Sequence, residues 1–273
     1  MLEMFKVVLL GIVEGITEWL PISSTGHMIL VDEFVKLNCT DEFLSMFLVV
    51  IQLGAIMAVV ALYFSKLMPL TRHEGKIKLI PSKLRLWSKI LVASLPAALI
   101  GLAFDDLIEE KLFNPLVVAL TLIVYGVAFI VIEYYNKDRE VRINDLKQMD
   151  YKTALGIGVF QILALIPGTS RSGATIIGGI LLGTSREIAA EFTFYLAIPI
   201  MFGASLLKIF KFGLAFTLAE ATMLLIGCAV AFVVSIFAIK FLMGYIKKHD
   251  FSVFGYYRIL VGALVLIYFF LVK

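Results

Sequence analysis

The chain contains eight separate stretches of mostly apolar residues, and these stretches limit what it can fold into more than any other feature. A transmembrane helix needs about 20 apolar residues, so the eight stretches would place roughly 160 residues in lipid. The composition agrees with this, because 61% of the 273 residues are hydrophobic and 16% are charged, against about 25% charged in ordinary soluble domains. The sequence therefore predicts an all-α, polytopic integral membrane protein without a separate soluble domain.

The charged residues and cysteines exclude several classes of function. A net charge of +3 is too small and too scattered for a nucleic-acid surface, so we expect no nucleic-acid partner. Cys39 and Cys228 are two cysteines far apart in the chain, which excludes a disulfide framework and a thiolate metal site. Residues 1–10 lack the features of a cleaved leader, so we expect no removable signal peptide.

Two of the apolar stretches, residues 4–20 and 154–167, are short and run into small, hydroxyl-rich segments. We call residues 21–27 (PISSTGH) the first break and residues 167–173 (PGTSRSG) the second break. A short apolar run follows each break. Non-helical backbone at membrane depth is tolerated only where protein or water satisfies it, so this pattern favours a re-entrant hairpin. We predict about six transmembrane helices plus two re-entrant helical hairpins.

The two halves of the chain resemble one another. Pro21 and Ser24 match Pro167 and Ser170 at a spacing of 146. Later matches, at a spacing of 149, are Glu42-Phe43 with Glu191-Phe192 and Gly54-Ala55 with Gly203-Ala204. An odd number of crossings per half would insert the second half upside down, as in many transport proteins. We predict one membrane domain, residues 1–273, with an inverted-topology repeat: repeat 1 (1–150, hairpin 4–38 plus three spans) and repeat 2 (151–273, hairpin 154–185 plus three spans).

Basic residues in short loops indicate the orientation. Residues 65–89 contain seven Lys or Arg and one acidic residue, and residues 136–152 contain five basic residues, so both segments should be cytoplasmic. Beyond them the pattern is ambiguous, because Lys208 and Lys211 would then lie outside. An alternative with eight full spans exchanges the last two loops. The repeat and the polar breaks favour the hairpins.

Glu14 and Glu18 lie four residues apart in the first apolar stretch, on one helix face. A charge near the bilayer centre costs about 2.5–3.5 kcal/mol, so both carboxylates need compensation. Carboxylate oxygens suit Mg²⁺ or Ca²⁺, which also bind phosphate. We therefore expect a divalent cation at Glu14 and Glu18. The structural alternative is a helix end at the headgroups, where water solvates both carboxylates.

The first break offers hydroxyls from Ser23, Ser24 and Thr25, a turn at Gly26 and the imidazole of His27. A hydroxyl with an imidazole and a carboxylate nearby is a set suited to nucleophilic or acid-base catalysis. Alone, such serines more often cap a helix and such a histidine is more often a satisfied interior residue. Their proximity to two glutamates favours a catalytic site.

The second break carries Arg171 between Ser170 and Ser172, with Thr175 one turn later. A guanidinium in an apolar setting needs an anionic partner, and its planar fork matches phosphate. Gln161, before the second break, and Gly168, within it, are further candidate substrate ligands. The structural alternative is an ion pair of Arg171 with Glu14 or Glu18.

Together, two facing breaks would form a phosphate site inside the bilayer. Its natural substrate is an amphiphile whose tail stays among the spans while its phosphate or diphosphate reaches the breaks. No nucleotide-binding glycine motif accompanies it. Transport of an anion or lipid is the main rival, because carriers are also built from inverted repeats with broken helices.

Three motifs resemble the signatures of the undecaprenyl-diphosphate phosphatase family, the bacitracin-resistance proteins of bacteria. They are Glu14-x-x-x-Glu18, the run from Leu20 to His27, and the run from Pro167 to Thr175. Length, motif order and span pattern are similar over essentially the whole chain. A phosphatidate-type phosphatase fits less well, because its Lys-x₆-Arg-Pro element is absent from the sequence.

This resemblance implies that the chain removes one phosphate from a C55 isoprenoid diphosphate, recycling the lipid carrier of peptidoglycan synthesis and conferring bacitracin resistance. It implies a cytoplasmic-membrane enzyme whose active site faces the outer side. Glu18, Ser24, His27 and Arg171 are the expected catalytic residues, with Ser24 as candidate nucleophile, and Glu14 is also expected to be essential. The sequence leaves open a phosphoserine or direct attack by water. It also leaves a homodimer open, because scattered glycines suit internal packing or a dimer face.

The candidate substrate ligands are Ser23, Thr25, Gly26, Gln161, Gly168, Ser170, Ser172 and Thr175.

Overall fold

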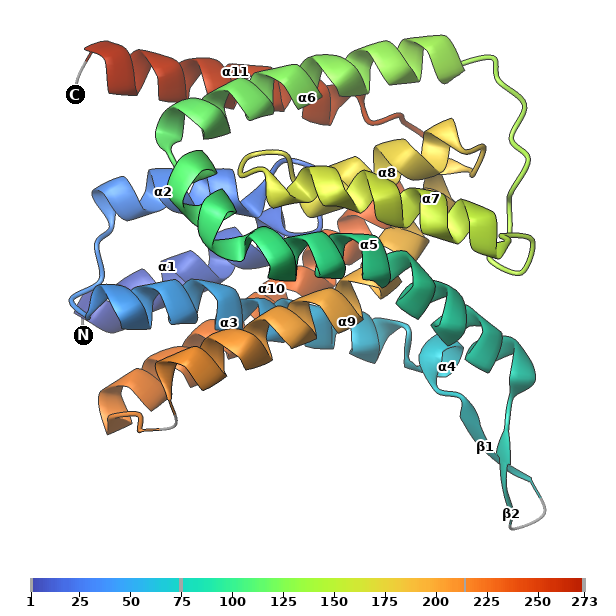
Figure 1. The fold of residues 1–273 in the computed structure, drawn as a ribbon, viewed down its shortest axis with the longest axis horizontal. Coiled ribbons are helices and arrows are strands. Elements are labelled where there is room, and N and C mark those ends of the chain that lie inside the picture. Colours follow the sequence, from blue (N-terminus) through green and yellow to red (C-terminus); the bar gives the residue numbers. More distant parts are fainter. Residues whose placement is uncertain (1, 74–75, 214, 272–273) are drawn as a thin grey trace.

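The computed structural model describes residues 2–73, 76–213 and 215–271 and is mainly helical (Figure 1). Within these residues six helices are long and apolar enough to cross a membrane. They are α3 (Asp41–Leu62), α5 (Pro81–Leu112), α6 (Pro115–Asn136), α9 (Arg186–Phe212), α10 (Leu218–Tyr245) and α11 (Ser252–Leu271). The prediction of an all-α membrane protein with six spans is confirmed.

The shorter elements include the helix that precedes each break and the helix that begins within it. These are α1 (Leu2–Thr17) and α2 (Ser24–Phe34) at the first break, and α7 (Tyr151–Ile162) and α8 (Arg171–Leu181) at the second. A 3₁₀ turn, η1 (Leu163–Leu165), precedes the second break. The remaining elements are α4 (Phe64–Leu67), β1 (Leu70–His73) and β2 (Lys76–Leu79). The hairpin of β1 and β2 lies in a segment that the sequence presented as a loop.

Polar side chains cap the helices where the chain leaves a loop. Asn114 accepts a hydrogen bond from Val117 N at the start of α6, and Thr217 forms a capping box with Glu220 at the start of α10. Asp150 caps α7 by accepting from Thr153 N, and this hydrogen bond lowers the pKa of the Asp150 carboxyl. Such caps satisfy N–H groups that have no partner within the helix, so helix starts are well defined.

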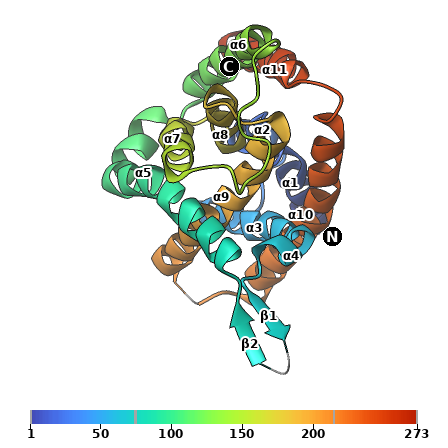
Figure 2. The ribbon, with the colours of Figure 1, turned by 90° about the vertical axis from the view of Figure 1, so that its right-hand side faces the viewer.

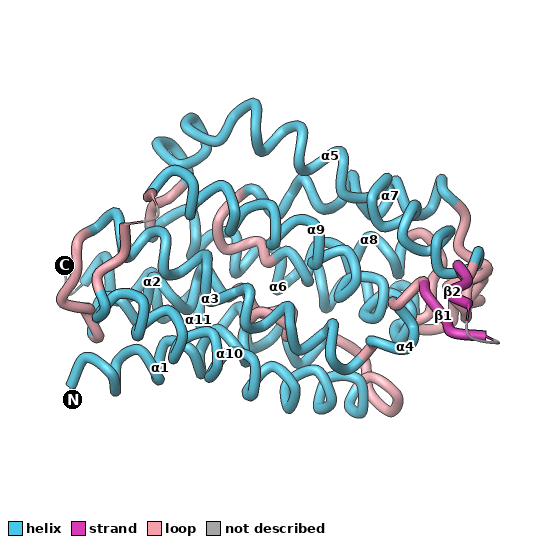
Figure 3. The backbone as a smooth tube through the Cα atoms, turned by 90° about the horizontal axis from the view of Figure 1, so that it is seen from below, coloured by secondary structure: helices cyan, strands magenta, loops and turns pink. Residues whose placement is uncertain are grey.

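The long helices run along the longest axis of the molecule and surround the breaks (Figure 1). Helices α1, α3, α9 and α10 pack on one side, and α6 and α11 form a pair on the opposite side, with α2 and α8 between them (Figures 1 and 2). Seen from below, α5 and α7 lie along another side (Figure 3). The two breaks therefore lie inside the bundle, where α6 and α11 cover them.

Glycines allow close helix contacts at two positions. A Cβ at Gly54 of α3 would lie 2.0 Å from Cys228 O of α10, and one at Gly158 of α7 would lie 2.1 Å from Ala93 O of α5. Since real side chains do not approach backbone that closely, both helix pairs depend on the missing Cβ.

The backbone at the two breaks shows the same unusual conformation. Ser23 and Ser170 have φ values of 75° and 73°. Each caps the following helix, because Ser23 Oγ accepts from Gly26 N at 3.2 Å and Ser170 Oγ accepts from Gly173 N at 3.1 Å. These equivalent positions are 147 residues apart. The match of Ser170 with Ser24 was therefore off by one residue, because the cap geometry pairs Ser170 with Ser23.

Three connecting segments lie together at one end of the helices, on the right in Figure 1. They are residues 63–73 with 76–80, 137–150 and 246–251, and they carry most of the basic residues of the loops. A pocket at this end is lined jointly by residues 136, 139–141, 180, 183–187 and 246. This grouping agrees with six spans, because the eight-span alternative would place residues 246–251 at the other end.

Candidate active site

An ion pair between Glu18 and Arg171 joins the two breaks. Arg171 Nη2 lies 3.1 Å from Glu18 Oε1, and Arg171 Nε donates to the same oxygen at 3.3 Å. The third nitrogen, Nη1, donates to Thr193 O of α9 at 3.0 Å. Both charged side chains are nearly buried, with 11% and 7% of their surface exposed. A buried pair of this kind holds both groups in place.

Ser24 completes a three-residue cluster with that pair. Ser24 Oγ donates to Glu18 Oε2 at 2.7 Å, while Arg171 occupies the other carboxylate oxygen. Glu18 follows the last residue of α1, and its N–H still donates to Glu14 O at 3.0 Å. A hydroxyl whose hydrogen bond is accepted by a carboxylate has a general base within reach. The cluster therefore combines three groups whose chemistry suits a nucleophile, a general base and a phosphate-binding cation.

Hydroxyl groups of the second break hold the loop that carries Glu18. Ser172 Oγ donates to Glu18 O at 3.1 Å and lies 3.1 Å from Ser170 Oγ. Thr175 Oγ1 accepts from Thr193 Oγ1 at 2.8 Å, which links α8 to α9. Ser172, predicted as a substrate ligand, thus also positions the acidic residue.

The hydrogen bonds of the His27 ring go to residues other than Ser24. Its Nδ1 lies 2.7 Å from Ser23 O, and its Nε2 lies 2.8 Å from the hydroxyl of Tyr257. The rings of His27 and Tyr257 are parallel, with centroids 5.6 Å apart and 2° between their planes. The carboxylate of Glu18 is thus the basic group in contact with Ser24, and Tyr257 of α11 adds a phenol that we did not predict.

Arg258 is a second buried guanidinium, also not predicted. It is fully buried, and it donates to Pro21 O at 3.1 Å and to Gly168 O at 2.8 Å. These carbonyls belong to the first and second break, so one side chain of α11 bonds to both. Thr121 of α6 adds a hydrogen bond to Pro167 O at 2.7 Å. An arginine in an apolar span is unusual enough to have been noticed from sequence.

Several buried polar atoms near the breaks have no hydrogen-bond partner among the described residues. They include Glu14 Oε1, both amide atoms of Gln161, and Thr169 Oγ1. Buried polar groups normally have partners, so unpaired ones mark places where a ligand, water or ion would bind. Glu14 and Gln161 are also 147 residues apart, the spacing that relates Ser23 to Ser170.

Other predicted residues lie on α2 and in the second break. Thr25 is half-buried on α2, and Gly26 supplies the N–H that Ser23 accepts. Gly168 has φ 87°, and a Cβ there would lie 2.1 Å from Thr121 Oγ1, so both its conformation and its close contact require glycine.

The carboxylates of Glu14 and Glu18 are suited to one mode of metal binding. Among the described residues no group of three or more His, Cys, Asp or Glu side chains forms a potential metal site. Magnesium, however, commonly uses one or two carboxylates and takes its remaining ligands from substrate phosphates and water. The unpaired Oε1 of Glu14 and the nearby Glu18 are suited to this mode.

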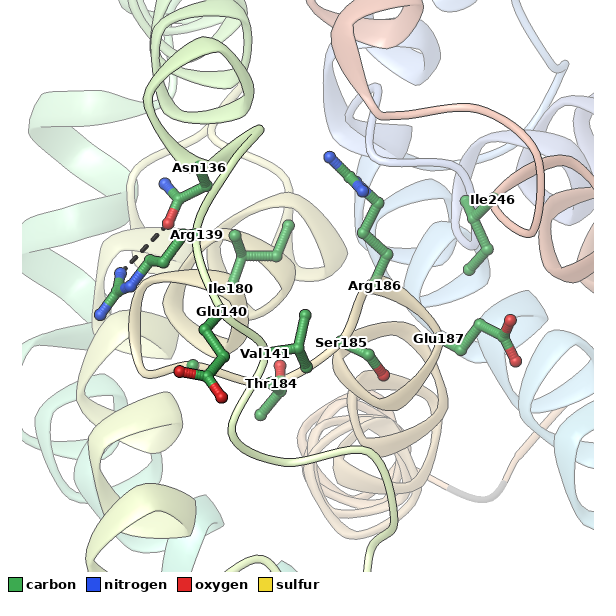
Figure 4. Close-up of a pocket in the computed structure, with 11 residues that line it drawn as sticks. Asn136, Arg139, Glu140, Val141, Ile180, Thr184, Ser185, Arg186, Glu187 and Ile246 are labelled. Carbon is green, nitrogen blue, oxygen red and sulfur yellow. Dashed lines mark hydrogen bonds between the residues drawn. The ribbon is translucent and has the colours of Figure 1, made fainter.

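A pocket at the basic end of the bundle does not include the predicted residues (Figure 4). Its cations already have partners within the described part of the chain. Arg139 donates to Asn136 Oδ1 at 3.1 Å and to Leu181 O at 3.0 Å, and Arg186 forms a bidentate ion pair with Glu133. The breaks, rather than this pocket, hold the candidate active site.

Comparisons with known proteins agree with the motifs. Three similar curated proteins are named undecaprenyl-diphosphatase. That of Acetivibrio thermocellus is 63% identical over 273 residues, covering all of both chains. That of Desulfitobacterium hafniense is 60% identical over 270 residues (98% of this chain and 97% of the relative), and that of Enterococcus faecalis is 59% identical over 268 residues (97% of each). A family model described as bacitracin resistance protein BacA matches residues 7–264, so the chain belongs to the BacA family of bacitracin resistance proteins.

Proposed function

We propose that this chain hydrolyses undecaprenyl diphosphate to undecaprenyl phosphate and inorganic phosphate. The names of the relatives support this activity. The observation that carries it is the cluster in which Glu18 contacts both Arg171, at 3.1 Å, and Ser24, at 2.7 Å. Such an activity recycles the lipid carrier for envelope polymers and counters bacitracin, which sequesters the lipid diphosphate.

The substrate enters with its isoprenoid tail among the spans and its diphosphate at the breaks. Arg171 exchanges part of its contact with Glu18 for the terminal phosphate, since a guanidinium binds phosphate and carboxylate through the same planar fork. The hydroxyls of Ser170 and Ser172 and the N-terminus of α8 supply further donors for phosphate oxygens.

In the reaction that we propose, Glu18 takes the proton from Ser24 Oγ as this oxygen attacks the terminal phosphorus. A bond forms between Ser24 Oγ and that phosphorus, and the bond from the same phosphorus to the bridging oxygen breaks. The bridging oxygen leaves as part of undecaprenyl phosphate. Water then attacks the phosphoserine and gives a proton to His27. The bond from phosphorus to Ser24 Oγ breaks, Glu18 returns its proton to this oxygen, and inorganic phosphate leaves. Arg171 stabilises the charge throughout, as is typical of phosphoryl transfer.

A divalent cation, Mg²⁺ or Ca²⁺, also belongs to the proposal. Glu14 and Glu18 would hold it together with the diphosphate. When bound, it would neutralise the negative charge of the phosphates.

We further propose how the chain lies in the membrane. The basic end faces the cytoplasm according to the distribution of Lys and Arg. The pairs α1–α2 and α7–α8 are then re-entrant hairpins of two inverted repeats, supported by the shared geometry at Ser23 and Ser170. The cytoplasmic membrane as location, an active site open to the outer side, and a homodimer stay predictions.

The test is phosphate release by purified protein in detergent, with C55 and C15 isoprenoid diphosphates. We expect release from both, and its loss in Ser24→Ala. A carrier would release no phosphate in detergent, so an inactive wild-type protein would contradict the proposal and favour transport. Radioactive phosphate trapped on the wild type but not on Ser24→Ala would demonstrate the phosphoserine. An active Ser24→Ala variant would instead assign the attack to water.

A further inference from the structure

The strands β1 and β2 form a two-sided antiparallel ribbon. Leu70 pairs with Leu79 and Arg72 pairs with Ile77, so these four side chains share one face. Side chains alternate along a strand, which places Thr71, Lys76 and Lys78 on the opposite face. One face of the ribbon is therefore mostly apolar, and the other is polar and basic.

The apolar face is uncovered among the described residues. Ile77 is 74% exposed, Leu79 is 59% exposed and Leu70 is 41% exposed. A two-stranded hairpin without a packing partner is marginally stable in water. A cluster of three large apolar side chains on such a ribbon therefore requires another surface to cover it.

The base of the ribbon is fixed to the helical bundle. Lys83 Nζ donates to Ser65 O at 2.5 Å and to Met68 O at 2.9 Å, and Trp87 Nε1 donates to Leu67 O at 2.8 Å. Lys66 also forms an ion pair with Glu191 of α9 at 2.7 Å. These bonds hold the segment before β1 against α5 and α9, so the direction of the ribbon is set by the bundle.

The β1–β2 ribbon points sideways from the helical bundle. The ribbon leaves the basic end of the molecule and runs across the direction of the long helices (Figure 1). Seen along those helices, it extends beyond the outline of the bundle (Figure 2). For a protein whose six long helices cross a bilayer, this position lies over the lipid headgroups rather than over the protein.

We infer that the β1–β2 ribbon is an anchor for the anionic lipid surface, with Leu70, Ile77 and Leu79 inserted at the boundary of the acyl chains. Charge complementarity selects this partner, because the ribbon carries Arg72 on its apolar face and Lys76 and Lys78 on its polar face. Each such cation raises the binding constant for an anionic surface by about fivefold. Arg72 can extend its guanidinium to the headgroups while its stem lies among the apolar residues. The inference depends on the membrane placement above and not on the phosphatase reaction.

The experiment uses the full chain in lipid nanodiscs, with Cys39→Ser and Cys228→Ala removing the native thiols. An environment-sensitive fluorophore is attached at Ile77→Cys on the apolar face or, as matched control, at Thr71→Cys on the polar face. The discs contain phosphatidylcholine alone or with added phosphatidylglycerol. Thermal unfolding of each labelled protein establishes that the fold is retained.

In anionic discs we expect the label at position 77 to be several-fold less quenched by acrylamide than the label at position 71. The triple variant Arg72→Gln, Lys76→Gln, Lys78→Gln should remove this protection. Equal quenching at both positions in anionic discs would overturn the inference. Protection that is the same in neutral discs, or that appears only when two chains share a disc, would overturn it as well and assign the face to a protein partner.

Discussion

Arg258 Nη2 donates to Gly168 O at 2.8 Å, and through this bond the last helix of the chain reaches the second break. The same guanidinium donates to Pro21 O of the first break. Carbonyl oxygens at irregular backbone have no helical partner, and in an apolar interior each needs a donor. A single arginine thus supplies a donor to one carbonyl of each break and links the two breaks.

Replacing Arg258 should disrupt the site without touching the reacting groups. Arg258→Met leaves the two carbonyls without donors, at about 1–3 kcal/mol each. We expect a lower midpoint of thermal unfolding in detergent and at least a tenfold loss of kcat/KM. Arg258→Lys should recover little, because an ammonium lacks the fork that reaches both oxygens. Lys248→Met, at an exposed position of the basic end, is the control. Wild-type kcat/KM in Arg258→Met would contradict this role.

The residues of the central cluster should differ in importance. Arg171→Ala and Glu18→Ala should each abolish turnover, since each removes a charge and leaves the other buried and unpaired. Ser172→Ala should lower activity only about fivefold, because the hydrogen bonds that it removes, to Glu18 O and to Ser170, are between neutral groups. Phosphate release by the three purified variants checks this order. Full activity of Glu18→Ala would remove the carboxylate from the mechanism.

Tyr257 should support His27 only in part. Tyr257→Phe removes the hydrogen bond to Nε2 but keeps the parallel ring contact and the bond from His27 to Ser23 O. We expect kcat/KM to fall about fivefold, clearly less than in His27→Ala. The neighbouring Tyr256 is 62% exposed, and Tyr256→Phe should leave the rate unchanged. Equal losses in Tyr257→Phe and Tyr256→Phe would show that the phenol has no specific role.

Gly158 should be among the glycines least tolerant of substitution. A Cβ there would lie 2.1 Å from Ala93 O, so Gly158→Ala must separate α7 from α5. Overpacking of this kind costs about 1–3 kcal/mol or more. At Gly203 nothing lies within 4 Å of an added Cβ, and Gly203→Ala should be neutral or stabilising. Unfolding midpoints of the two alanine variants, measured in the same detergent, compare them directly. A similar midpoint for both would exclude tight packing at Gly158.

Removal of divalent cations should reduce phosphate release if Glu14 and Glu18 hold a cation with the substrate. Glu14→Gln should raise the Mg²⁺ concentration needed for half-maximal activity, because one negatively charged ligand is lost. Glu187→Gln, at an exposed residue of the basic end, should not change it. Activity that is unaffected by a chelator would discard the cation.

The sequence predicted the six spans and indicated that Arg171 needs an acidic partner, but it could not distinguish Glu14 from Glu18. That choice depends on where α1 ends. Since the helix stops at Thr17, Glu18 lies in the turn that faces Arg171, while Glu14 stays inside the helix with an unpaired oxygen. Periodicity predicts helix faces and is much weaker at helix ends.

Other features lie outside what the motifs could indicate. Arg258 and Tyr257 are distant from both breaks along the chain, and only the packing of α11 on α6 brings them to the site. The alternation Lys76-Ile77-Lys78-Leu79 is too short to predict a strand within a basic segment. The one-residue difference in the repeat arose because Ser23 and Ser24 are identical in type, and only the positive φ of Ser23 distinguishes them.

The position of Arg258 on α11 has a consequence for biogenesis. Because ribosomes synthesise the chain from its N-terminus, both breaks are made before Arg258, whose guanidinium bonds to a carbonyl of each. The nascent protein thus holds the proposed nucleophile and base in an unfinished arrangement until α11 has been made and packs on α6, so the candidate active site is completed only after that step.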